Sequence, residues 1–144
     1  LTSNGASLGW ALGAAVGAKL AAPERTVVAL VGDGTFVYGA PTSALWAANR
    51  YSSPFLTVIF NNQEHFATRR SLQNFYPDSA SARTETWIGM DINPSPDYAS
   101  LAQALDAYGE RVSDPSEVIP ALERGLQEVK NGRSAVIDVL IRRV

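Results

Sequence analysis

Thr26–Gly34 reads TVVALVGDG, and the architecture of the chain can be worked out from these residues. Its first part, Thr26–Val31, is β-branched and apolar without polar alternation, which is typical of a strand covered on both faces of a parallel sheet. The predicted strand runs directly into Gly32-Asp33-Gly34. Parallel sheets bind ligands beyond the carboxyl ends of their strands. The sequence therefore predicts a ligand site close to Asp33.

A second buried strand is predicted to end in the same way. Phe55–Phe60 (FLTVIF) is continuously apolar apart from one threonine and leads into Asn61-Asn62. The segment Thr35–Phe60 has room for one loop, one helix and this strand. A right-handed βαβ crossover brings the carboxyl ends of two such strands to the same edge of the sheet. We therefore expect Asp33 and the two asparagines to lie close together.

The remaining patterns predict an α/β fold, with a parallel sheet and helices on both faces, in a single domain spanning residues 1–144. Further helices are expected at Ser7–Ala21, Thr42–Asn49, Tyr98–Tyr108 and Pro115–Lys130, and further strands at Gly109–Val112 and Ser134–Ile141. Gln63–Asp97 shows no periodicity and is expected to be a loop-rich insert, with Arg69–Asp97 as a candidate lid. Glycines recur every fourth residue at 9, 13 and 17, which indicates a closely packed partner for the first helix.

The composition excludes several classes of protein. The chain has 144 residues, of which 46% are hydrophobic, and a net charge of −2. This balance argues against a nucleic-acid surface or a polybasic membrane patch. The absence of cysteine excludes disulfides, iron–sulfur clusters and zinc–thiolate sites, and fits a cytoplasmic protein. The apolar stretch Leu8–Ala18 is shorter than the roughly 20 residues of a membrane span.

The two strand ends carry side chains suited to a metal-bridged diphosphate. Asp33 offers an anionic oxygen and either Asn61 or Asn62 a neutral one, and Mg²⁺ prefers such oxygen ligands together with substrate phosphates. Gly32 and Gly34 allow close approach of the backbone and expose N–H groups to phosphate oxygens. Either motif alone is also common as a plain turn after a strand. The two together at this spacing favour the metal site.

The pair of motifs resembles the signature of the thiamine diphosphate-dependent enzymes. Asn4–Trp10 (NGASLGW) and Ala14–Ala18 are similar to the segment before that signature in 2-oxo acid decarboxylases and acetolactate synthases. Ala44–Ala48, with Tyr51 and Pro54, resembles benzoylformate decarboxylase-like members. The resemblance covers nearly the whole chain. It implies the C-terminal diphosphate-binding domain, a Rossmann-like three-layer sandwich, here lacking its first strand and helix.

The resemblance also implies roles for individual residues. Asp33 and Asn62 would bind Mg²⁺ through their side chains, and Glu64 through its main-chain carbonyl. Leu8 would hold the cofactor bent, and the carbonyl of Ala6 would accept a hydrogen bond from its aminopyrimidine. The cofactor-binding set implied in this way is Ala6, Leu8, Gly32, Asp33, Gly34, Thr35, Asn62, Glu64, His65 and Phe66, with His65 and Phe66 acting through their backbone.

The resemblance further implies that this chain is half of an active site. The glutamate that activates the cofactor would come from the pyrimidine-binding domain of a partner subunit or of a missing N-terminal region, in a homodimer or tetramer. The start at Leu1 is read as a start inside a larger assembly, and the chain alone is expected to be inactive. The substrate would be a small 2-oxo acid. Departures from the family pattern at Ala6, Ser7 and Gln63–Phe66 leave the identity of the substrate open. The choice between decarboxylation, carboligation and acyl-CoA lyase chemistry depends on residues of other domains.

Three other functions are weighed against this one. Ser7, in a G-x-S-x-G match, precedes Asp33 and His65 in the order of a serine hydrolase, but too few residues precede it for the required strand. A nicotinamide-binding domain would need G-x-G-x-x-G and a helix directly after it, and neither is expected. A non-catalytic scaffold has no need for Leu8, Asp33 and Asn62 together. His65 is open between a catalytic acid/base and a polar loop residue.

Overall fold

The computed structural model describes residue 2 and residues 7–143. Its strands are β1 (Val28–Gly32), β2 (Leu56–Asn61), β3 (Tyr108–Val112) and β4 (Ala135–Leu140). Its helices are α1 (Trp10–Ala21), α2 (Asp33–Tyr38), α3 (Pro41–Arg50), α4 (Phe66–Phe75), α5 (Ala80–Thr84), α6 (Tyr98–Gln103) and α7 (Val118–Lys130), with a 3₁₀ turn at Pro115–Glu117.

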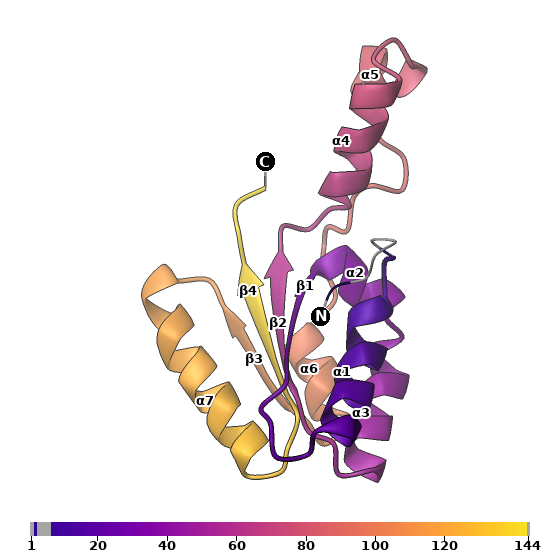
Figure 1. Ribbon diagram of the computed structural model, residues 1–144. Coiled ribbons are helices and arrows are strands. Elements are labelled where there is room, and N and C mark those ends of the chain that lie inside the picture. Colours follow the sequence, from indigo (N-terminus) through magenta and orange to yellow (C-terminus); the bar gives the residue numbers. More distant parts are fainter. Residues whose placement is uncertain (1, 3–6, 144) are drawn as a thin grey trace.

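The four strands form one parallel sheet in the order β1-β2-β4-β3 (Figure 1). In the register of β1 and β2, Gly32 lies beside Phe60, and in that of β2 and β4, Asn61 lies beside Leu140. The carboxyl ends of β1 and β2 therefore meet at one edge of the sheet. This confirms the parallel α/β fold predicted from the sequence.

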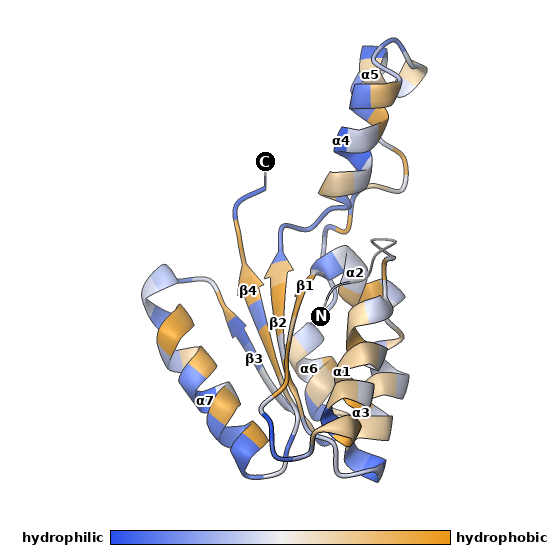
Figure 2. Ribbon diagram, in the orientation of Figure 1, coloured by the Kyte–Doolittle hydropathy of each residue, from blue (hydrophilic) through white to orange (hydrophobic). Residues whose placement is uncertain are grey.

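Helices cover both faces of this sheet. In Figure 1, α7 lies on one side and α1, α3 and α6 lie on the other. The first core, between the sheet and α1, α2, α3 and α6, contains Leu12, Phe36 and Phe55, and the second, under α7, contains Leu56 and Ile137. Figure 2 shows that β1, β2 and β4 are mainly hydrophobic, whereas β3 is largely hydrophilic and α7 carries residues of both kinds. The burial of these two cores is the main stabilising contribution to the fold.

A short helix, α2, begins directly at the end of β1, where the sequence predicted only a turn. Gly32 is extended, and Asp33 is already the first helical residue. An acidic residue in the first turn is favourable because the helix dipole is positive there. The helix has six residues, which is too short to leave a periodic pattern. One argument against a nicotinamide-binding domain, the absence of a helix directly after the glycines, is therefore wrong, whereas the unsuitable glycine spacing remains.

The segment Gln63–Asp97 is also more regular than predicted. It contains α4 and α5, which project beyond the carboxyl edge of the sheet (Figure 1). None of the residues of these two helices is buried. The segment of α4 is polar overall and α5 has only five residues, so neither helix stands out in the sequence as an element of the core.

Two predictions about glycines change with the structure. Gly9 has φ +86°, and a Cβ there would lie 2.5 Å from the carbonyl oxygen of Tyr38, so this glycine does allow a close approach. At Gly13 and Gly17, an added Cβ would meet no described atom within 4 Å beyond the helix itself. Gly109 was predicted to stop a helix running to Tyr108. The helix ends at Gln103 instead, and Gly109 lies inside β3, in the strand predicted for Gly109–Val112, where a Cβ would overlap the carbonyl of Ala99 in α6.

Candidate functional site

Three oxygen-bearing groups converge at the carboxyl edge of β1 and β2. One terminal atom of the Asn62 amide lies 3.1 Å from Asp33 Oδ1 and 3.0 Å from the main-chain oxygen of Glu64. With its nitrogen in that place, Asn62 donates a hydrogen bond to each of these oxygens. With its oxygen there, that oxygen lies from each of the other two at close to the distance of about 2.9 Å that separates adjacent ligands in a Mg²⁺ octahedron. The donor set therefore fits the metal that the sequence implied.

Asp33 is the charged member of this group. Its side chain is buried, with a residue exposure of 1%, and Oδ1 accepts a hydrogen bond of 3.0 Å from the N–H of Gly34. Burial raises the pKa of Asp33, while backbone hydrogen bonds from Gly34 and Gln63 act in the opposite direction. Oδ2 has no hydrogen-bond partner among the described atoms. A buried carboxylate oxygen without a donor is costly, and a bound cation would satisfy it.

Gly34 makes room for the side chain of His65. A Cβ at position 34 would overlap Nδ1 of the imidazole, so the ring packs over the glycine backbone. The other contact of the ring is edge-to-face with Tyr38, at a centroid distance of 5.7 Å. The N–H of His65 donates to the carbonyl of Met90 at 2.8 Å. His65 is thus built into the packing beside Asp33, and its backbone N–H already has a partner within the chain.

Glu64 turns its carboxylate away from the metal donors. That carboxylate is almost fully buried and pairs with Arg69 at 3.4 Å and with Arg143 at 3.6 Å. The backbone of Gln63 and Glu64 is also held in place. Glu64 forms an antiparallel bridge with Asp91, and the N–H of Ile92 donates a hydrogen bond of 2.9 Å to the carbonyl of Gln63. Glu64 can therefore offer its main-chain carbonyl to a cation, as the sequence analysis expected.

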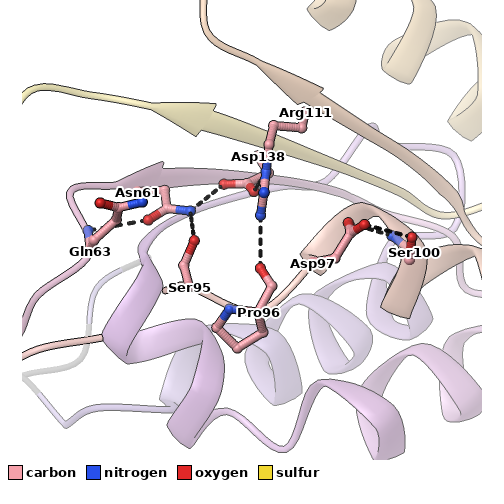
Figure 3. A network of polar contacts seen from close by, with 8 residues as sticks. All are labelled: Asn61, Gln63, Ser95, Pro96, Asp97, Ser100, Arg111 and Asp138. Carbon is pink, nitrogen blue, oxygen red and sulfur yellow. Dashed lines mark hydrogen bonds and ion pairs between the residues drawn. The ribbon is translucent and has the colours of Figure 1, made fainter. Parts of the chain in front are cut away.

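The two asparagines have separate surroundings. Asn61 is completely buried, and its Nδ2 donates to Asp138 Oδ1 at 2.9 Å and to Ser95 Oγ at 3.2 Å (Figure 3). Its Oδ1 accepts a hydrogen bond of 3.2 Å from the N–H of Gln63. The sequence left both asparagines open as metal ligands. In the structure, only Asn62 lies beside Asp33 and the Glu64 carbonyl.

The sequence analysis missed the polar groups behind Asn61. Asp138 lies in β4 with no exposed surface, and its Oδ2 accepts a hydrogen bond of 2.7 Å from Arg111 Nε. Tyr98 is also buried, and its hydroxyl has no hydrogen-bond partner among the described atoms. Burial, and then the charges of Asp33 and Asp138, raise the pKa of Tyr98 to about 12. The sequence does hold a signal for this network. Asp138 is a single charge inside the apolar run Ser134–Ile141, and a buried carboxylate there would need a charged or polar partner.

The other expected cofactor residues surround this edge. Thr35 lies in the first turn of α2 and Phe66 is the first residue of α4, with the guanidinium of Arg69 5.6 Å from the centre of its ring. Leu8 lies just before α1 and is 47% exposed. Ala6 lies outside the described residues, so the role predicted for its carbonyl stays a prediction.

The hydrolase alternative lacks a required contact. In a serine hydrolase triad, the carboxylate accepts a hydrogen bond from the histidine. Here Asp33 Oδ1 is bound to Gly34, and Oδ2 has no partner among the described atoms, so Asp33 and His65 are not joined in this way. Ser7 precedes α1 in a turn.

Residues 2 and 7–143 contain no group of three or more histidine, cysteine, aspartate or glutamate side chains that could hold a metal ion. A site of one carboxylate, one amide and one main-chain carbonyl is not a group of that kind. In the same residues, no helix has both the length and the apolar character needed to cross a membrane.

Comparison with known proteins identifies the family of the chain. The family described as thiamine pyrophosphate enzyme, C-terminal TPP binding domain, matches residues 2–139. Sulfoacetaldehyde acetyltransferase of Rhodobacter capsulatus is 32% identical over 134 residues, which cover 92% of this chain and 21% of that protein. The large subunit of acetolactate synthase isozyme 3 of Escherichia coli is 30% identical over 135 residues, with coverages of 94% and 22%.

A solved structure leads to the same family. It is the thiamine diphosphate-dependent 4-hydroxybenzoylformate decarboxylase of Rhodococcus jostii RHA1, with a TM-score of 0.78 and 31% identity, and the match covers 95% of this chain and 24% of that one. The chain spans about a fifth of the length of the curated relatives it matches. It belongs to the thiamine pyrophosphate enzyme family and corresponds to the C-terminal TPP-binding domain.

Proposed function

We propose that this domain binds Mg²⁺ through Asp33, Asn62 and the main-chain carbonyl of Glu64, and through the metal the diphosphate of thiamine diphosphate. The observation that carries the proposal is the position of the Asn62 amide, 3.1 Å from Asp33 Oδ1 and 3.0 Å from the Glu64 carbonyl oxygen. The buried Asp33 Oδ2, which lacks a partner among the described atoms, supports it. A divalent cation would supply the charge that this carboxylate needs and would neutralise the diphosphate at the same time.

The other residues at this edge have positioning roles in the proposal. Gly34 keeps the start of α2 free of a side chain, and the N–H of Thr35 would be available to the diphosphate, whereas the N–H of Gly34 donates to Asp33 Oδ1. The backbone at Phe66 would also contribute to the diphosphate site, the N–H of His65 is already bound to the Met90 carbonyl, and Leu8 would support the bent cofactor. When bound, thiamine diphosphate supplies a carbanion that attacks a carbonyl carbon and then accepts the electron pair released there.

For the complete enzyme, we propose a small 2-oxo acid as substrate, with either decarboxylation or carboligation as the outcome. The proposal is supported by the names of the relatives, which include an acetolactate synthase and a 4-hydroxybenzoylformate decarboxylase. The second half of the site would come from a pyrimidine-binding domain, in a homodimer or tetramer. The exposure of Leu8 and the projection of α4 and α5 past the sheet are compatible with such a partner.

Substitution of the charged ligand tests the metal site. In the complete enzyme, Asp33→Asn removes the charge with little change in shape, and we expect Mg²⁺-dependent binding of thiamine diphosphate, measured by calorimetry, to weaken by at least about a hundredfold. Asp78→Asn, at an exposed aspartate, is the matched control and should bind as the wild type does. Equal binding by Asp33→Asn and wild type would contradict the proposed site. No thiamine diphosphate binding by the wild-type enzyme would favour a scaffold role instead.

A further inference from the structure

Asp138 is an unusual residue for its position. It lies in β4 between the apolar residues Ile137 and Val139 and has no exposed surface. In the sheet it is beside Ile59 of β2 on one side and Arg111 of β3 on the other. A buried carboxylate of this kind is costly unless it is fully paired, and an apolar residue of similar size would often be at least as stabilising. Packing alone therefore gives no reason for a carboxylate here.

Each oxygen of the carboxylate has its own donor (Figure 3). Oδ2 accepts from Arg111 Nε at 2.7 Å, and Oδ1 accepts from Asn61 Nδ2 at 2.9 Å. The same guanidinium donates through Nη2 to the carbonyl of Pro96 at 2.7 Å, while Asn61 Nδ2 also reaches Ser95 Oγ at 3.2 Å. The carboxylate thus joins three strands and the loop before α6.

The orientation of the Asn61 amide follows from these contacts. Because a carboxylate only accepts hydrogen bonds, Asn61 must turn its nitrogen toward Asp138, and its oxygen then faces the other way. That oxygen accepts the N–H of Gln63 at 3.2 Å, which closes a turn around Asn62. Gln63 has φ +60°, a left-handed conformation that a non-glycine residue adopts only when its surroundings hold it there. This turn presents the Asn62 side chain and the Glu64 carbonyl to Asp33.

We propose that Asp138 is a positioning residue for the metal site, acting through Asn61 on the turn that carries Asn62 and Glu64. The inference rests on the proposed Mg²⁺ site. Asp138 touches none of the three metal donors in this arrangement and fixes them by fixing the amide of Asn61. Outer-shell partners of metal ligands typically contribute 10- to 100-fold to metal affinity, and Asp138 contributes in that range.

Asp138→Asn is the informative substitution. An asparagine has one acceptor oxygen where the aspartate has two, so either Arg111 or Asn61 faces an amide NH₂ group and loses its acceptor. In the complete enzyme with saturating thiamine diphosphate, Mg²⁺ titrated by calorimetry should bind 10- to 100-fold more weakly. Excess Mg²⁺ should restore most of kcat, because the donors are displaced and not removed. Glu110 of β3 pairs with Arg124 of α7, away from the metal site. Glu110→Gln, which removes the charge of this pair, is the matched control and should leave Mg²⁺ affinity unchanged.

The outcomes separate this inference from the proposed function. Weaker Mg²⁺ binding by Asp138→Asn, with kcat recovered at high Mg²⁺, supports the positioning role. Mg²⁺ affinity within threefold of wild type, while Asp33→Asn loses binding, overturns it and leaves the proposed metal site intact. Normal binding by Asp33→Asn contradicts the metal site itself. If Asp138→Asn does not fold, Asn61→Ser removes the amide that Asp138 orients, and unchanged Mg²⁺ affinity in that variant overturns the inference.

Discussion

At the scale of single residues, the candidate site depends on where side chains are absent as much as on where they are present. Asp33 and Asn62 supply donors, but the imidazole of His65 occupies the space that a side chain at Gly34 would need. The N–H of Gly34 in turn donates to Asp33 Oδ1. One glycine thus allows two contacts that shape the metal-binding edge.

Gly34→Ala should be destabilising for this reason. The added methyl group overlaps the His65 ring, so either the ring or the start of α2 must move, and we expect the free energy of unfolding of the chain to fall by about 1–3 kcal/mol. Urea denaturation followed by circular dichroism measures this change.

Two further variants identify the cause. The double variant Gly34→Ala with His65→Ala should recover part of the loss relative to His65→Ala alone, since the overlap no longer exists. Gly13→Ala, in α1 with no described atom near the added methyl, should raise the free energy of unfolding by up to about 1 kcal/mol. A Gly34→Ala variant as stable as the wild type would show that the ring has room to move.

At the scale of elements, the structure ties its parts together by side chains between neighbouring strands and helices. In β3, Glu110 accepts two hydrogen bonds from Arg124 of α7 and one from the hydroxyl of Tyr108. Arg111, next in the strand, points to Asp138 instead. Consecutive residues of a strand face opposite sides of a sheet, so β3 is linked to α7 on one face and to the buried network on the other.

The Glu110–Arg124 contact should make stability depend on pH. The side-chain hydrogen bond from Arg124 lowers the pKa of Glu110 from its usual value of 4.5. A lowered pKa in the folded state means that the contact stabilises fully above pH 4.5 and is lost as the pH falls through the lowered value. We therefore expect Glu110→Gln to melt at a lower temperature than wild type at pH 7, and the difference to shrink in acid.

The control for this prediction is Glu123→Gln. Glu123 is exposed inside α7, away from the helix N-terminus, and pairs with no cation among the described residues, so its loss should change neither the melting temperature nor its pH dependence. Thermal melts of the three proteins between neutral and acidic pH provide the comparison. A constant difference between Glu110→Gln and wild type at every pH would contradict an electrostatic origin.

At the scale of the whole molecule, the sequence was sufficient to predict the parallel sheet and the closeness of Asp33 and Asn62 at its edge. Long apolar runs ending in Asp33 and in Asn61-Asn62 are strong local signals, and the crossover rule brings them together. The division of roles between the two asparagines depends on Asp138, which is distant in sequence and carries no motif. Helices α2 and α4 escaped prediction because one is very short and the other is polar overall.

The same view of the whole chain leads to a prediction about β1, the edge strand of the sheet. In β1, the exposed residues Val28 and Leu30 alternate with the buried residues Ala29 and Val31. Val28 and Leu30 face the same side of the sheet as α7, but α7 covers the other strands and leaves β1 open, so Leu30 is 64% exposed. Exposed apolar edge strands promote self-association. In the isolated chain, Leu30→Ser should reduce self-association measured by light scattering and change the free energy of unfolding by no more than about 0.5 kcal/mol.

Leu45→Ser is the contrasting variant, because Leu45 lies in the core with 1% of its surface exposed. Its loss should cost about 2–5 kcal/mol, as large-to-small substitutions in cores do. If Leu30→Ser unfolded the isolated chain to the same extent, the exposure of β1 would be contradicted. The complete enzyme shows whether β1 is exposed to solvent there as well. If Leu30→Ser is stable in the isolated chain but lowers the melting temperature of the assembly, residues outside this chain cover β1.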